Sequence, residues 1–168
     1  MLKEDNVCDI EDLASIPNVI AVDTTVGYTF LNQLQITNLN VASGKAYKIV
    51  VNGLQKGVGA YVDRNYKYST VPASLSGSTY IVTANNDKKA RTASFLSFDV
   101  NQDVTVYVAH DDRITTKPSW LGTKVDDILI SGNAFSIFES NYLAGTITLG
   151  DNQGVRKTGM YTVVIVGQ

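Results

Sequence analysis

A chain of 168 residues with a formal net charge of −2 lacks the basic field that nucleic-acid binding requires, so nucleic acid is excluded as a partner. Its single cysteine, Cys8, excludes an internal disulfide and a cysteine-based zinc cluster. No window approaches the about 20 apolar residues of a membrane-spanning helix, and residues 1–7 lack the apolar segment of a lipoprotein signal.

The N-terminal residues 1–18 form an acidic arm in which only residues 8–16, CDIEDLASI, favour a helical turn. After the arm, short segments rich in β-branched and aromatic residues alternate with Gly, Asn, Asp and Pro, the punctuation of strands and turns. These segments predict strands over residues 18–31, 34–41, 46–54, 57–68, 79–84, 95–100, 104–110, 126–131, 134–140, 145–150 and 160–168.

Two of these segments indicate how the strands are buried. Val104, Val106 and Val108 alternate with smaller or more polar residues, so one face of that strand should enter the core. Residues 161–166, YTVVIV, are apolar almost throughout, which is typical of a central strand covered on both sides. The sequence predicts an all-β fold, a two-sheet antiparallel β-sandwich that is jelly-roll-like, with residues 19–168 as one domain.

Residues 61–77 and 107–122 follow one plan: Tyr-Val, then Asp-Arg, a stretch containing Ser or Thr, Pro-x-x-Leu and Gly. Each copy predicts a strand end tied by an ion pair, after which Pro directs the chain toward a Leu plug. The predicted structural ion pairs use Asp63 with Arg64, and Arg113 with Asp112 or with an Asp of a neighbouring strand.

The order of motifs from about residue 60 to 166 carries a resemblance. It runs through DRNYKYSTVPASLSGSTYIVTANNDK, FLSFDVNQDVTVYVAHDDRITTKPSWL, FSIFESNYLAGTITLGDN and MYTVVIV. The segment resembles accessory β-sandwich modules of secreted bacterial polysaccharide-degrading enzymes and large surface proteins. The resemblance implies a non-catalytic module similar to carbohydrate-binding modules, located outside the cell or at its surface.

Catalytic patterns are weak in this chain. His110 is the only histidine, and no Gly-x-Ser-x-Gly elbow accompanies it. Glycoside hydrolysis needs two carboxylates across a cleft, yet the two Asp pairs, 111–112 and 126–127, are chain neighbours that would point to opposite faces of a strand. We therefore expect no enzyme and no cofactor.

Oxygen-rich turns leave one alternative to plain turn formation. Calcium in β-sandwich loops is bound by Asp, Asn and backbone carbonyl oxygens, although no EF-hand spacing is present. The candidate ligands of a structural calcium ion are Asp87, Asp126, Asp127 and Asp151.

Aromatic residues are the strongest indication of sugar binding. A pyranose ring stacks on Trp or Tyr while its hydroxyls bond polar side chains. The candidate stacking residues are Trp120, Tyr66, Tyr68 and Tyr61, although the simpler interpretation of Trp120 is that it plugs one end of the sandwich.

Two functions follow. The first is a non-catalytic extracellular module that binds a polysaccharide or cell-surface glycan through exposed aromatics. The second is a structural subunit of a bacterial surface layer or fibre, or an adhesin. Such a subunit would self-associate through residues 1–25 by β-strand addition.

Overall fold

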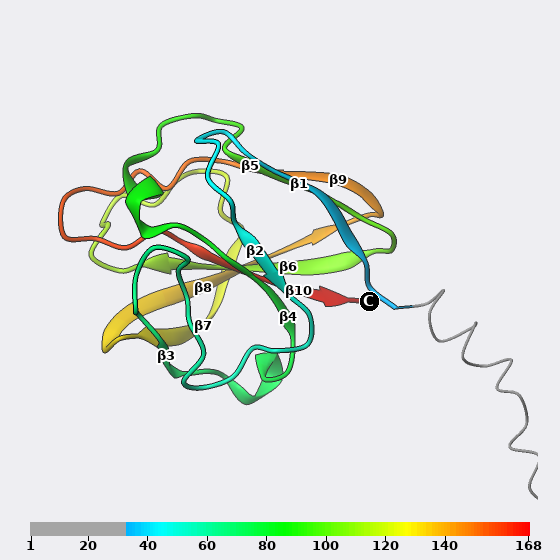
Figure 1. Cartoon of the computed structure of the whole chain (residues 1–168), viewed down its shortest axis with the longest axis horizontal. Coiled ribbons are helices and arrows are strands. Elements are labelled where there is room, and N and C mark those ends of the chain that lie inside the picture. The colour runs from blue at the N-terminus through cyan, green and yellow to red at the C-terminus, as the bar shows by residue number, and fades with distance from the viewer. Residues whose placement is uncertain (1–32) are drawn as a thin grey trace, which may run out of the picture. The chain divides into compact units, whose positions relative to one another are not determined.

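The computed structural model describes residues 33–168, of which residues 34–168 form one compact unit (Figure 1). The predicted arm, its helical turn, the strand over residues 18–31 and the proposed self-association segment lie outside the described residues. Within the described part, no helix is long and apolar enough to cross a membrane.

The fold is all-β and consists of two antiparallel sheets, as the sequence predicts (Figure 1). The smaller sheet has the order β1-β5-β9, with bounds Ile36–Val41, Leu96–Val100 and Gly145–Leu149. The larger sheet has the order β2-β4-β10-β6-β8-β7-β3. Its strands span Lys48–Val50, Thr79–Val82, Thr162–Gly167, Val104–Asp111, Asn133–Tyr142, Thr123–Ile130 and Tyr68–Thr70. Two short 3₁₀ helices complete the list, η1 (Ala73–Leu75) and η2 (Asn85–Lys89).

Strand β10 lies between β4 and β6 in the middle of the larger sheet, which confirms the interpretation of its continuous apolar run. One face of this sheet packs toward the smaller sheet. Val104, Val106 and Val108 are buried there, and the Tyr161 hydroxyl, just before β10, donates to the Gly150 carbonyl after β9 at 3.0 Å.

The opposite face of the larger sheet is also covered. Tyr80 of β4 donates from its hydroxyl to the Gly59 carbonyl at 3.2 Å, and its ring meets that of Tyr68 edge to face, with centroids 5.7 Å apart. The connection between β2 and β3 therefore covers this face. Only isolated bridges occur within residues 57–67, so most of the strand predicted there is loop.

Candidate functional site

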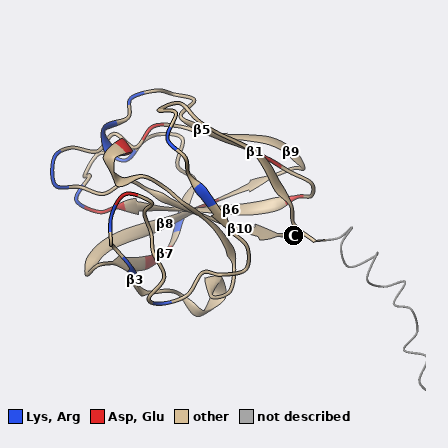
Figure 2. Ribbon diagram, in the orientation of Figure 1, with Lys and Arg blue, Asp and Glu red and all other residues tan. Residues whose placement is uncertain are grey.

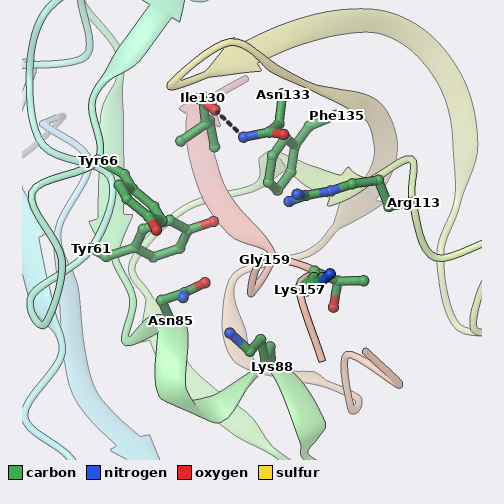
Figure 3. Close-up of a pocket in the computed structure, with 11 residues that line it drawn as sticks. Tyr61, Tyr66, Asn85, Lys88, Arg113, Ile130, Asn133, Phe135, Lys157 and Gly159 are labelled. Atoms are coloured by element: carbon green, nitrogen blue, oxygen red, sulfur yellow. Dashed lines mark hydrogen bonds between the residues drawn. The ribbon is translucent and has the colours of Figure 1, made fainter. Parts of the chain in front are cut away.

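A pocket of about 110 Å³ opens where β6 ends and β8 begins, on the face of the larger sheet that carries Asp111 and Phe135. Its walls come from four connecting segments and from the adjoining ends of β7 and β8, and Figure 3 shows their side chains converging on one space. The lining residues are Tyr61, Tyr66, Asn85, Lys88, Arg113, Ile130, Asn133, Phe135, Lys157, Thr158 and Gly159. We call this space the corner pocket.

Two tyrosines form the aromatic wall of the corner pocket. The Tyr66 side chain is 43% exposed, whereas Tyr61 is buried. Their rings meet edge to face, with centroids 6.0 Å apart and an interplanar angle of 74°. The Tyr61 hydroxyl donates to the Met160 carbonyl at 2.7 Å, and burial raises the pKa of Tyr61 well above its ordinary value. Tyr61 is therefore a neutral and firmly held part of the pocket wall, and Tyr66 exposes its ring to solvent.

The opposite wall depends on a buried carboxylate. Asp111, the last residue of β6, is fully buried, and its two oxygens accept bonds from the Arg113 side chain at 2.9, 3.2 and 2.5 Å. The Arg113 amide and the Gly159 amide also donate to Asp111. Burial alone would raise the pKa of Asp111, but these bonds outweigh burial and lower it. Asp111 is therefore ionised and holds the guanidinium at the pocket edge.

The structure thus pairs Arg113 with Asp111 and not with Asp112, which the sequence favoured. The reason is that Asp111 ends the strand and begins a tight turn, in which the Ile114 amide donates to the Asp111 carbonyl at 3.0 Å. This turn brings residues two apart together. Asp112 instead accepts from the Ser136 hydroxyl at 2.7 Å and lies 3.5 Å from the Lys117 ammonium.

Asp63 and Arg64 form the second corner. The Asp63 carboxylate accepts from the backbone amides of Asn85 at 2.7 Å and Asn86 at 2.9 Å, at the start of η2. The Arg64 guanidinium donates to the Asn86 side chain at 2.6 Å but lies 3.9 Å from the Asp63 carboxylate. Asp63 therefore acts mainly by positioning η2, which contributes Asn85 and Lys88 to the corner pocket.

Cationic side chains complete the lining. Lys88, Arg113 and Lys157 come from three separate loops, and no Asp or Glu is among the lining residues. Figure 2 shows Lys and Arg in the loops at this end of the sandwich, on the left of the view, and Figure 3 shows Arg113 and Lys88 directed toward the pocket space.

A buried polar hub lies behind the pocket. Asn152, fully buried, donates to the carbonyls of Lys88 at 2.8 Å and Gly159 at 3.0 Å. The backbone carbonyl of Asn152 accepts from His110 Nε2 at 2.9 Å, while Nδ1 of the same ring lies 3.2 Å from the Lys117 ammonium. Burial lowers the pKa of His110 to about 4, so the imidazole is neutral at pH 7 and accepts a bond from Lys117. His110 therefore supports the loops that carry the pocket.

The four aromatic residues proposed for sugar binding separate into two groups. Tyr61 and Tyr66 line the corner pocket, whereas Tyr68 is 1% exposed and can offer no ring to a ligand. Trp120 is half-buried against Tyr161, with centroids 5.5 Å apart, and its indole N–H donates to the Asp151 carbonyl at 2.9 Å. Its ring lies directly over Gly150, where an added Cβ would be 2.4 Å from Cδ1, so Trp120 closes one end of the sandwich.

The proposed calcium ligands are dispersed over the fold. Asp87 accepts from Ser43, Lys45 and Tyr47, and Asp127 pairs with Lys124 at 2.9 Å. Asp126 accepts from the Asp127 amide, and Asp151 from the Gln153 side chain. Residues 33–168 contain no group of three or more His, Cys, Asp or Glu side chains arranged to hold a metal ion. A structural calcium ion stays a prediction without a site among these residues.

Sequence reasoning did not identify Asn85, Lys88, Asn133 and Lys157 as lining residues. Asn85 and Lys88 belong to the run ANNDKK, which suggested an oxygen-rich turn. The available signal was the repeated Asp-Arg plan, because both copies border the same pocket: Tyr61 and Tyr66 come from the first and Arg113 from the second. Chemically, the arrangement combines an exposed ring, amides and fixed cations, which suits binding of a polar ligand with one apolar face.

Comparison with known proteins relates this fold to glycoside hydrolases. No protein-family model matches the chain. A β-glucuronidase of Formosa agariphila is 27% identical over 134 residues, which cover 73% of this chain and 13% of that enzyme. The solved structure of a β-glucuronidase from glycoside hydrolase family 2 matches with a TM-score of 0.70 and 24% identity, covering 78% of this chain and 14% of the other. A family 138 glycoside hydrolase that targets the pectin rhamnogalacturonan II matches at a TM-score of only 0.48.

These matches correct one prediction. The expectation that the chain is not an enzyme is wrong, because the proteins that it matches are β-glucuronidases. The chain spans about an eighth of their length. The comparisons also confirm the coarse part of the resemblance, namely a β-sandwich that is similar to part of a glycoside hydrolase.

Proposed function

We propose that the β-sandwich of residues 34–168 binds carbohydrate in the corner pocket and thereby serves a glycoside hydrolase of the β-glucuronidase type. The observation that carries this proposal is the exposed Tyr66 ring facing a set of fixed hydrogen-bonding groups from separate loops. The similarity to part of two β-glucuronidases supports a role in carbohydrate processing.

Binding would use the two sides of the pocket differently. The apolar C–H face of a sugar ring would stack on Tyr66, where a pyranose gains contact area with a rigid side chain. The hydroxyls on the other side would bond the side chains of Asn85, Asn133 and Arg113. Asn133 lies at the start of β8, and Arg113 is anchored on a buried carboxylate, so little side-chain freedom is lost on binding.

Retention of the protein in gels that contain soluble polysaccharides tests the proposal. Tyr66→Ala should abolish or strongly reduce retention, since it removes the ring on which the apolar face of the sugar stacks. Leu143→Ala is the matched control because Leu143 is 79% exposed, lies in the turn after β8 and does not line the pocket. Both variants should keep the wild-type circular dichroism spectrum.

Three results are informative. Loss of retention in Tyr66→Ala alone supports the corner pocket. Equal retention of Tyr66→Ala and wild type would contradict it. Loss of retention in Trp120→Ala without loss of folding would place the binding site at Trp120, which the sequence also proposed as a stacking residue.

A further inference from the structure

We infer that the sugar bound in the corner pocket carries an oxyanion, either a carboxylate or a sulfate ester, and that Lys88, Arg113 and Lys157 bind it. This inference rests on the proposed function, because it names the chemical class of the same ligand. Its basis is the charge of the pocket and the way in which each cation is held.

The pocket has more positive than negative charge. Three cations line it, and the one carboxylate bonded to them is Asp111, which leaves two positive charges without a counter-ion among the lining residues. Within residues 33–168, neither the Lys88 nor the Lys157 side chain forms an ion pair. The whole chain has a net charge of −2, so this local excess is a feature of the pocket and not of the protein.

Arg113 is oriented for a second partner. Its Nε and Nη2 atoms face the carboxylate of Asp111, and among residues 33–168 no acceptor is bonded to Nη1. The guanidinium has five N–H donors in one plane. The edge with Nε and Nη2 is bonded to Asp111, and the N–H groups of Nη1 are available to a ligand. Figure 3 shows this side chain reaching toward the middle of the pocket. A planar donor group fixed in this way is suited to the oxygens of a carboxylate or sulfate.

The two lysines are carried by loops that are tied together. The Lys88 carbonyl accepts from the Gly154 amide at 2.8 Å and from Asn152 at 2.8 Å. A Cβ at Gly154 would lie 2.5 Å from the Lys88 carbonyl oxygen, so this close approach requires glycine. Lys157 has a φ of 73° in a turn closed by the Thr158 hydroxyl, which donates to the Val155 carbonyl at 2.9 Å.

A left-handed conformation at a lysine is costly, and the turn around it is held by three bonds between Val155 and Thr158. The turn therefore fixes the backbone of Lys157 beside the pocket, and η2 does the same for Lys88. A bound oxyanion would pair with these two ammonium groups, whereas a neutral sugar would not.

The test uses the full chain and matched probes in isothermal titration. Oligogalacturonate carries a charged carboxylate where its methyl ester carries a neutral ester group, and sulfated galactan differs from its desulfated form in the sulfate. Neutral xylan and cellulose oligosaccharides complete the set. The inference predicts that one charged probe binds at least about tenfold more tightly than its uncharged match, the size of one charge-assisted hydrogen bond.

Variants assign the effect to the pocket. The double substitution Lys88→Gln with Lys157→Gln should reduce the affinity for the preferred charged probe about tenfold or more. Arg113→Lys should also weaken binding, because a lysine cannot donate two parallel N–H bonds to the oxyanion as the planar guanidinium does. Lys48→Gln with Lys56→Gln removes the same charge from exposed residues that do not line the pocket and should change the affinity less than about twofold. The carboxylate and sulfate pairs show which oxyanion is preferred.

The outcomes separate the two proposals. Equal binding of charged and uncharged probes, lost in Tyr66→Ala, would overturn the oxyanion inference and leave sugar binding intact. An equal loss of affinity in the Lys48/Lys56 control would also overturn it, because the attraction would then be general. Failure of every probe, charged and neutral, would overturn sugar binding and the inference together.

Discussion

The substitution Asp111→Asn tests how the corner pocket is held together. Both carboxylate oxygens are used: Oδ1 accepts from the Arg113 amide and Nε, and Oδ2 accepts from Arg113 Nη2 and the Gly159 amide. An asparagine must present its NH₂ group to one of these two pairs of donors. Whichever way the asparagine amide is turned, two of the four N–H donors lose their acceptor and face its NH₂ group. The buried ion pair with Arg113 is also lost.

The expected cost follows from the burial of this pair. Breaking a buried ion pair by removing one partner typically costs about 3–5 kcal/mol. Arg113 is 44% exposed and can be rehydrated after the change, so we expect a loss near the lower end, about 3 kcal/mol. This is a large fraction of the about 5–15 kcal/mol that separates folded and unfolded states of a typical domain.

Urea unfolding followed by the fluorescence of Trp120, the only tryptophan, measures this loss. With a slope of about 1–3 kcal/mol per molar urea, the midpoint should fall by about 1–3 M with an unchanged slope. Asp126→Asn is the control, because Asp126 is exposed and its carboxylate bonds only the adjacent Asp127 amide. A stability of Asp111→Asn within about 0.5 kcal/mol of wild type would refute this account of the corner, since surface changes alone produce that much.

Three further predictions concern the supports of the pocket. The pKa of His110 is about 4 in the folded state and about 6.5 in the unfolded state, so the unfolded state binds the proton first as pH falls. The free energy of unfolding should therefore decrease by up to about 3 kcal/mol between pH 6.5 and 4. Urea titrations at each pH should show that a His110→Gln variant lacks this component. Gly150→Ala places a Cβ 2.4 Å from Trp120, so the near-ultraviolet circular dichroism should change and the free energy of unfolding should fall by about 1–3 kcal/mol. Gly59→Ala, whose added Cβ has no neighbour within 4 Å, should leave the tryptophan signal unaltered. Asp63→Ala removes both acceptors of the Asn85 and Asn86 amides at the start of η2 and should cost about 1–3 kcal/mol by urea unfolding. An unchanged stability would mean that η2 is held by other contacts.

The sequence predicted the sheets because strand burial follows from local pattern. Continuous apolar character placed β10 at the centre of the larger sheet, and alternation placed Val104, Val106 and Val108 in the core. The alternation predicts one buried face for β6, but Ala109 and Asp111 on the opposite face are buried too. Segments distant in sequence cover these two residues, so the local pattern of β6 does not predict their burial.

The pocket could be predicted only in part. Tyr66 was identified because a sugar ring can stack on a tyrosine side chain. Lys88 and Lys157 were not, because isolated lysines in loops are typical surface residues, and their convergence depends on how Asn152 ties the two loops together. The partner of Arg113 was missed for a similar reason, since the turn after β6 decides which of two adjacent carboxylates is within reach.

The corner pocket itself is tested most directly by nuclear magnetic resonance. Titration of the ¹⁵N-labelled chain with the best-binding oligosaccharide should shift the side-chain amide signals of Asn85 and Asn133 and the backbone amides of Tyr66 and Gly159, while signals from the smaller sheet stay fixed. Shifts confined to residues outside the corner pocket, such as those around Tyr107 and Glu139 of the larger sheet, would contradict the assignment of this pocket as the sugar site.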